Sequence, residues 1–304
     1  MPLLVVGSVA LDSVETPTDS RDNVLGGSAV FFSYAASYFT PVRLVGVVGD
    51  DWPSEHTELL QRRKIDTAGL QIVPGKETFR WRGKYMPNMN DRETLEVHLN
   101  VFGEFDPVLP EEHKRAEFVF LANGSPVVQM KVLDQVPGAR LAVADTMDLW
   151  IREQHGELMQ LLKRIDGLVL NDSEAKLLTG DENLVRAGHR VREMGPKFVV
   201  IKKGEHGALL FGPHRFFSCG AYPLRQVFDP TGAGDSFIGA LAGYLCSLGR
   251  EGGHEFDDLA GAMVRGSILA GYTCESFSTH RLEKLNRDEF DTRLEEYRAF
   301  TRFA

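Results

Sequence analysis

Short apolar runs alternate with helical patterns along most of this 304-residue chain. Several runs, such as residues 3–6 and 208–211, are apolar at consecutive positions, which is typical of strands covered on both faces of a parallel sheet. The predicted strands are residues 3–6, 43–48, 118–122, 141–144, 167–170, 198–202 and 208–211. The predicted helices are residues 29–39, 54–63, 127–136, 150–163, 173–179, 183–194, 233–248 and 259–272. This alternation predicts an α/β fold with a mostly parallel central sheet and helices on both faces.

Residues 77–105 depart from this alternation. They contain two stretches of alternating polar and apolar residues joined by a polar loop at 87–92, a pattern typical of exposed strands. Together with residues 13–24, they are expected to form a small sheet that stands off the main unit. Two interpretations stay open, a lid over a site and a surface hairpin without function. We otherwise predict one domain over residues 1–304.

A glycine turn precedes one of the predicted helices. Residues 229–241 are Asp-Pro-Thr-Gly-Ala-Gly-Asp-Ser-Phe-Ile-Gly-Ala-Leu. Gly232, Ala233 and Gly234 are small enough to turn tightly and direct backbone N–H groups at a ligand, and helix N-termini attract phosphate. Asp235 would lie in the first helical turn, where a carboxylate can accept a proton from a hydroxyl that attacks a phosphoryl group. Aspartate at a helix start also suits the helix dipole, so a structural role stays open.

This stretch closely resembles the C-terminal signature of the ribokinase-like (PfkB) family of carbohydrate and nucleoside kinases. The similarity covers nearly the whole chain. It implies a ribokinase-like three-layer α/β/α fold with a β-sheet lid, and transfer of the γ-phosphoryl group of ATP to a hydroxyl of a sugar, polyol, cyclitol or nucleoside. It also implies that Asp235 is the base and that the turn from Gly232 to Gly234 is the anion hole.

Two further segments resemble the family's substrate-binding motifs. Gly-Ser-Val-Ala-Leu-Asp, ending at Asp12, is similar to a strand-end motif whose aspartate binds substrate hydroxyls, and open α/β sheets bind ligands at that edge. Gly26 and Gly27 resemble the N-terminal Gly-Gly signature, where glycine lets the backbone approach a polyol. Phe31 stands where ribokinase has asparagine, and the lysine of that motif is missing here. The departure at Phe31 favours a substrate more apolar than ribose, or of a different shape.

The predicted nucleotide site draws on two segments. Asn171-Asp-Ser-Glu174 matches the family's Asn-x-x-Glu motif, which the resemblance places near Mg²⁺ and the nucleotide phosphates. Mg²⁺ keeps several waters, so we expect Glu174 to hold it through water. The same residues also suit a helix N-terminal cap, and that interpretation stays open.

Lys-Lys-Gly-Glu-His-Gly, ending at Gly207, resembles the turn that forms one wall of the family's ATP site. Gly204 and Gly207 would shape that turn, and Lys203 is the predicted phosphate contact, although a plain hairpin and a solvated lysine would fit equally well. Adenine is expected between this turn and residues 266–270.

A monovalent-cation site is also implied by the resemblance. Residues 270–278 are similar to the loop that forms such a site with the residues matching Asp229 and Thr231. Asp229 and Thr231 are therefore predicted K⁺ ligands. Thr231, Gly232 and Gly234 are also assigned to nucleotide binding.

The amino-acid composition limits the partners that this chain can bind. The formal net charge of −9 argues against general affinity for nucleic acid or an anionic membrane, and no apolar stretch approaches the length of a membrane span. The N-terminus lacks the basic segment of a secretory signal, so we expect a cytoplasmic protein. Three cysteines far apart indicate neither a disulfide framework nor a zinc site. An exposed lid edge predicts a homodimer through the lid.

Two functional hypotheses remain. The first is a kinase of small sugar-like molecules, and the second is a catalytically idle relative that binds nucleotide or sugar as a sensor. For the kinase, an aromatic lid permits a nucleoside, and basic lid residues permit a sugar phosphate. The aromatic residues are Phe79, Trp81 and Tyr85, and the basic residues are Arg80, Arg82, Lys84 and Arg92.

Overall fold

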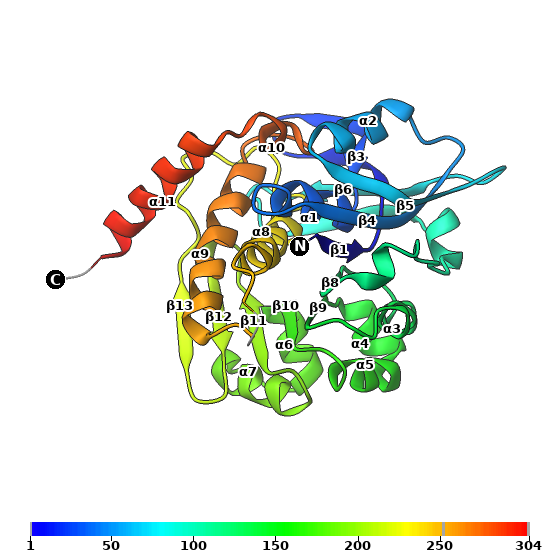
Figure 1. Ribbon diagram of the computed structural model, residues 1–304. Helices are drawn as coiled ribbons and strands as arrows, with labels where there is room; N and C mark the ends of the chain where they lie inside the picture. The colour runs from blue at the N-terminus through cyan, green and yellow to red at the C-terminus, as the bar shows by residue number, and fades with distance from the viewer. Residues whose placement is uncertain (1, 251–252, 303–304) are drawn as a thin grey trace.

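A nine-stranded sheet forms the centre of the molecule (Figure 1), and the computed structural model describes residues 2–250 and 253–302. The strand order is β13-β12-β11-β10-β9-β8-β1-β4-β5. Neighbouring strands from β5 to β11 run parallel, and β12 and β13 run antiparallel at one edge. The strands are β1 (Leu3–Val6), β4 (Val42–Gly49), β5 (Ile65–Val73), β8 (Phe118–Leu121), β9 (Leu141–Asp145), β10 (Gly167–Asn171), β11 (Phe198–Lys202), β12 (Ala208–Phe211) and β13 (Phe216–Cys219). The predicted, mostly parallel α/β sheet is confirmed.

Helices cover both faces of this sheet, which gives three layers. Leu3 and Val5 of β1 belong to the apolar cluster shared with α1, α8 and α9, whereas Leu4 and Val6 belong to the cluster shared with α3, α5 and α7. Alternate side chains of a strand point to opposite faces, so one apolar run fills two cores. The helices are α1 (Ser28–Ala36), α2 (Ser54–Arg62), α3 (Pro126–Gln135), α4 (Asp148–Glu153), α5 (His155–Leu162), α6 (Asp172–Thr179), α7 (Leu184–Glu193), α8 (Ala233–Ser247), α9 (Phe256–Thr273), α10 (His280–Lys284) and α11 (Arg287–Thr301).

The predicted elements differ from the structure in a few places. The helix predicted over residues 150–163 is two helices, because the backbone leaves helical geometry at Gln154 (φ −131°, ψ 40°). The elements β5, β13, α10 and α11 were not predicted. Polar residues interrupt the apolar pattern of β5, which lies at the edge of the sheet and is only partly buried.

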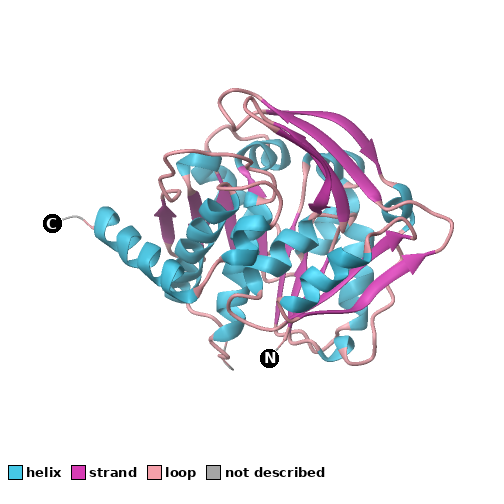
Figure 2. Cartoon of the chain, turned by 90° about the horizontal axis from the view of Figure 1, so that it is seen from above, coloured by secondary structure: helices cyan, strands magenta, loops and turns pink. Residues whose placement is uncertain are grey.

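A second sheet stands apart from the main one (Figure 2), with the strand order β3-β2-β6-β7. Its strands are β2 (Ala10–Glu15), β3 (Ser20–Gly26), β6 (Phe79–Tyr85) and β7 (Arg92–His98). Residues 13–24 were predicted to contribute to this sheet. This prediction is confirmed, because residues 13–24 lie within the antiparallel hairpin of β2 and β3, which begins earlier than predicted, at Ala10. We call this four-stranded sheet the lid.

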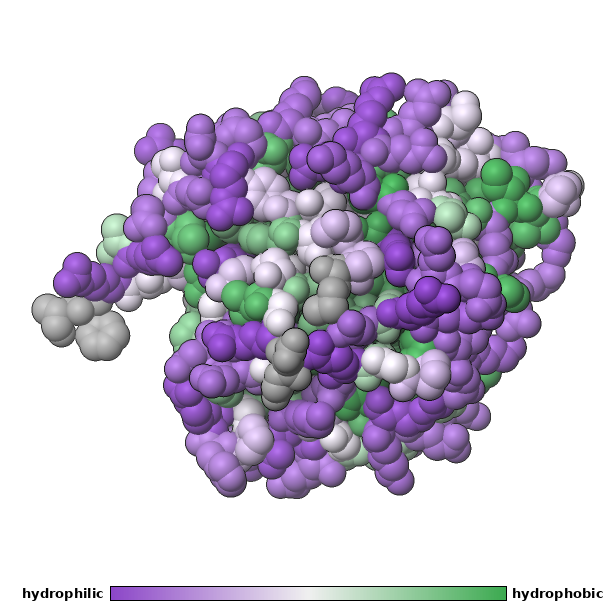
Figure 3. All heavy atoms as spheres, in the orientation of Figure 1, coloured by the Kyte–Doolittle hydropathy of each residue, from purple (hydrophilic) through white to green (hydrophobic). Residues whose placement is uncertain are grey.

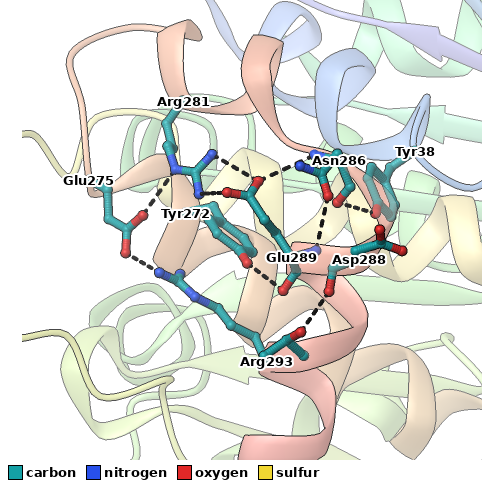
Figure 4. Close-up of polar contacts among 9 residues, drawn as sticks. Tyr38, Tyr272, Glu275, Arg281, Asn286, Asp288, Glu289 and Arg293 are labelled. Atoms are coloured by element: carbon teal, nitrogen blue, oxygen red, sulfur yellow. Dashed lines mark hydrogen bonds and ion pairs between the residues drawn. The ribbon is translucent and has the colours of Figure 1, made fainter.

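The C-terminal helix α11 is attached to α9 by an ion-pair network (Figure 4). Arg281 lies 3.2 Å from both Glu275 and Glu289, and Arg293 also pairs with Glu275. The Tyr272 hydroxyl donates to the Glu289 backbone carbonyl at 2.8 Å. This network holds the segment after α9, whose Cys274 carbonyl accepts from the Phe228 amide at 2.8 Å, one residue before Asp229.

One face of the molecule is covered mainly by hydrophilic residues, with smaller apolar patches between them (Figure 3). Within residues 2–250 and 253–302, the helices are all too short or too polar to cross a bilayer.

Candidate active site

The predicted glycine turn begins α8. Gly232 is the N-cap residue, with φ 76° and ψ 0°, a left-handed conformation that strains any residue with a side chain. A Cβ atom at Gly232 would lie 2.2 Å from the ring of Phe31. Phe31 is only 2% exposed, so this ring supports the turn from below. Phe31, which the sequence analysis assigned to substrate binding, therefore packs against the glycine turn and restricts the position of Gly232.

Asp235 lies in the first turn of α8 and is partly buried. Burial, followed by the negative charge of Asp145, raises the pKa of Asp235 to about 6, while Lys202 and Arg92 act in the opposite direction. A carboxyl group with this pKa is mostly ionised at neutral pH, yet remains a stronger base than an exposed aspartate. The position and pKa both suit a group that accepts a proton.

Lys202, which the sequence prediction passed over, lies beside this carboxylate. Its Nζ atom is 3.6 Å from Asp145 Oδ1 and 3.3 Å from where a Cβ atom of Gly234 would be. Burial tends to lower the pKa of Lys202, but Asp145, Glu174 and Asp235 outweigh burial, and the net pKa is raised. The ammonium group is therefore charged and lies against the glycine turn.

The sequence analysis predicted that the neighbouring residue, Lys203, contacts a phosphate. Lys203 lies one residue beyond the end of β11, and Lys202 rather than Lys203 lines the cavity at the glycine turn. Lys203 instead lies near the Cys219 thiol, and its amide donates to the Gly207 carbonyl at 2.7 Å. The local motif holds no signal that separates Lys202 from Lys203, and the cavity at the glycine turn makes the distinction.

The Asn171–Glu174 motif forms a complete capping box at the start of α6. The Glu174 amide donates to Asn171 Oδ1 at 2.8 Å, and the Asn171 amide donates to Glu174 Oε2 at 2.6 Å. The capping interpretation is thus confirmed. Glu174 is also 9% exposed, and burial, then the charge of Asp145, raises its pKa to about 7. The glutamate of a capping box at the protein surface would be solvated, whereas the Glu174 carboxylate is buried.

The acidic groups near the turn fit a divalent cation. Three carboxyl groups act on a single lysine, Lys202, and they belong to Asp145, Glu174 and Asp235. This ratio leaves an excess of negative charge that a cation would offset. Among the described residues, no three His, Cys, Asp or Glu side chains are grouped closely enough to bind an ion directly. A Mg²⁺ ion would therefore be held largely through water and phosphate oxygens.

The predicted substrate residues meet at the base of the lid. Asp12 lies within β2, rather than in a loop at the end of β1, and its Oδ2 accepts from the Gly27 amide at 3.3 Å. A Cβ atom at Gly26 would lie 2.0 Å from that oxygen, so only glycine fits there. Burial raises the pKa of Asp12 to about 7, against the hydrogen bond from Gly27. Asp12, Gly26 and Gly27 thus lie together in one corner, and their role in substrate binding stays a prediction.

Asp229 and Thr231 are buried next to the turn. The Thr231 amide donates to Asp229 Oδ1 at 2.8 Å, and the Thr231 hydroxyl donates to the Tyr85 hydroxyl oxygen at 3.2 Å. The second carboxylate oxygen, Asp229 Oδ2, is buried without a hydrogen-bond partner. An orphaned carboxylate oxygen fits a cation ligand, and K⁺ binding at Asp229 and Thr231 stays a prediction.

A cavity of about 410 Å³ opens at the glycine turn. Lys202, Gly204, Gly207 and Gly234 line one side of it, and residues of α9 line the other. The lid also reaches this cavity. The residues that line it from α9 and from the lid are Ser267, Ala270, Gly271, Asn88, Met89 and Asn90. The predicted adenine position, between residues 204–207 and 266–270, coincides with this space.

A second cavity, of about 400 Å³, lies at the carboxyl ends of β1 and β8. Gly7 and Ala122 line its floor, and Leu99, Phe102 and Trp150 line its walls. The Trp150 indole is fixed in place because its Nε1 donates to Asn123 Oδ1 at 3.0 Å. Gly7 lies next to Ser28, the residue after Gly27, so this apolar cavity adjoins the Asp12 corner.

A glycine turn at a helix N-terminus, a carboxylate in the first turn of that helix and a flanking cavity lie together on an α/β sheet with a lid. The model of the pfkB family carbohydrate kinases matches residues 12–283, and the chain belongs to this family. It is therefore a kinase of the carbohydrate and nucleoside class.

Individual relatives agree with this assignment. The chain is 31% identical over 251 residues to the cytidine kinase of Thermococcus kodakarensis, covering 80% of this chain and 88% of that one. It is 27% identical to the nucleoside kinase of Methanothermobacter thermautotrophicus, covering 80% and 82%. The ribokinase of Arabidopsis thaliana, solved with ribose and ATP, superposes with a TM-score of 0.76 at 20% identity over 97% of this chain and 98% of that one.

Proposed function

We propose that this protein transfers the γ-phosphoryl group of ATP to a hydroxyl of a nucleoside, with Mg²⁺ as the companion ion. The observation that carries the proposal is the placement of Asp235 beside the Gly232 turn and Lys202, with a cavity open at the same turn. This arrangement supplies a base, an anion hole and room for a nucleotide at one point.

The chemistry follows from these residues. Asp235 accepts the proton of the acceptor hydroxyl as its oxygen forms a bond to phosphorus and the bond to ADP breaks. The amides of Gly232, Ala233 and Gly234 stabilise the charge on the moving group. Mg²⁺, when bound, neutralises phosphate charge near Glu174 and Asn171.

A nucleoside is the favoured acceptor for two reasons. The relatives named above include a cytidine kinase and a nucleoside kinase. The apolar cavity beside Asp12, with Phe102 and Trp150 in its walls, has a volume in the range of small-ligand sites and suits a planar base. In this arrangement Asp12 would hold the ribose hydroxyls while the base enters the cavity.

A sugar phosphate has less support. Two of the four basic lid residues that could bind its phosphate are already held in ion pairs, because Arg80 lies 2.6 Å from Asp51 and Arg82 lies 2.8 Å from Asp22.

ATP consumption over a panel of cytidine, uridine, adenosine, inosine, ribose and a sugar phosphate tests the proposal. We expect turnover to be highest with a nucleoside and to be lost in excess chelator. Highest turnover with the sugar phosphate would contradict the acceptor class. Binding of an ATP analogue without turnover on any acceptor would favour the idle sensor.

Two further expectations are untested. β7 is the outer strand of the lid and is exposed along its whole length, which keeps the prediction of a homodimer through the lid. Measuring the oligomeric state of the protein in solution tests this prediction. The cytoplasmic location also stays a prediction.

A further inference from the structure

One arginine of the lid, Arg92, lies on the side that faces the glycine turn. Arg92 begins β7 and pairs in register with Tyr85 of β6, so the two side chains share a face of the lid. The Tyr85 hydroxyl interacts with Arg92 and accepts a hydrogen bond from Thr231, the residue before Gly232. Arg92 is therefore placed above the anion hole.

A second contact fixes the direction of this side chain. The Arg92 guanidinium lies 5.4 Å from the centroid of the Trp81 ring, and Trp81 pairs in register with Asp12. Arg92 thus lies between the substrate corner and the turn. Its charge acts on both carboxylates, Asp12 and Asp235, and lowers the pKa of each.

Arg92 is also available to a ligand, in contrast to Arg80 and Arg82 of β6. Arg80 and Arg82 form ion pairs with carboxylates, at 2.6 Å and 2.8 Å. Across the described part of the chain, no carboxylate forms an ion pair with Arg92, which is exposed. A cation that faces two acidic groups but forms no ion pair with either of them suits an anion that arrives with the substrates.

We propose that Arg92 contacts the transferring phosphoryl group when the lid closes, opposite the amides of Gly232–Gly234. This rests on the phosphotransferase function proposed above. The moving phosphoryl group carries its charge on three equatorial oxygens, and a guanidinium fork can donate to two of them at once. The reaction would thus be fast only with the lid closed, because one of its charge-stabilising groups is carried by β7.

The test compares Arg92→Met with Arg82→Met, which removes an ion-paired arginine from the same sheet. With ATP and cytidine, or the best neutral acceptor of the panel, we expect Arg92→Met to lower kcat at least about 100-fold. The acceptor KM should stay within about 3-fold, and Arg92→Lys should lose less than Arg92→Met because it keeps the charge. Arg82→Met should leave kcat close to that of the wild type.

A pH profile separates direct contact from tuning of the base. Loss of Arg92 raises the pKa of Asp235, so a defect due only to tuning would disappear at alkaline pH. Persistence of the defect at alkaline pH supports the contact, and full recovery overturns it.

Other outcomes are equally decisive. A raised acceptor KM with unchanged kcat would assign Arg92 to acceptor binding, and equal rates in Arg92→Met and Arg82→Met would remove any role; both overturn the proposal. Absence of phosphoryl transfer in the wild type would instead refute the phosphotransferase function itself.

Discussion

The candidate active site lies between the core and the lid, which we call its core wall and its lid wall. The charged groups of these two walls differ in burial and in their partners. On the core wall, Asp145 and Glu174 are buried, and Lys202 is 19% exposed and lies 3.6 Å from Asp145. On the lid wall, Arg92 is exposed, stacks on Trp81 and interacts with the Tyr85 hydroxyl. The core groups are set in place when the chain folds, at the cost of burying like charges together. Under the proposal above, the lid group is positioned for chemistry only when the lid closes.

The largest expected effect concerns the core wall. Asp235→Asn should lower kcat by between about 100-fold and 10,000-fold, since it removes the base while keeping the shape of the side chain. The wild-type rate should rise as the pH increases through about 6, because the carboxyl group must lose its proton to act. Steady-state kinetics across pH measure both effects. Binding of an ATP analogue is the control and should be retained; near-normal turnover in Asp235→Asn would exclude this residue as the base.

An intermediate effect separates the two adjacent lysines. Lys202→Met should lower kcat/KM for ATP roughly 100-fold, because its ammonium group lies against the glycine turn. Lys203→Met is the matched control and should change kcat/KM by less than about 3-fold, since Lys202 rather than Lys203 lines the cavity at the turn. Equal losses in the two variants would contradict the distinction drawn between them.

The smallest effect is on stability. Burial raises the pKa of Glu174 to about 7, so the folded protein holds a proton that the unfolded chain has released between about pH 4.5 and 7. Stability is therefore lost as the pH rises through this window. Glu174→Gln mimics the protonated form, and it should raise the melting temperature at pH 8 by roughly 2–4 °C, with little change at pH 5.

Thermal melting of Glu174→Gln in the absence of ligand makes this measurement. Glu96→Gln, on the exposed strand β7, is the control and should shift the melting temperature by less than about 1 °C at either pH. A lower melting temperature of Glu174→Gln at pH 8 would show that the ionised carboxylate stabilises the core wall.

Much of the fold could be predicted because its elements are encoded locally. The seven predicted strands are all present, and the apolar runs behind them are buried on both faces. The edge strand β5 and the helix α11 escaped prediction because their apolar residues are sparse, and their packing depends on distant partners. The break at Gln154 was missed for a different reason. The residues on either side of it keep a helical pattern, so the sequence reads as one helix.

The sequence by itself determined the glycine turn, the aspartate in the first turn of α8 and the capping box at Asn171, because each depends on residues close together in the chain. Only the tertiary structure decided that Phe31 lies beneath Gly232, and that Lys202 rather than Lys203 faces the turn. The same holds for the lid arginines, of which Arg92 alone has no ion-pair partner among the described residues. These features arise where segments distant in sequence meet, and local propensity carries no information about such contacts.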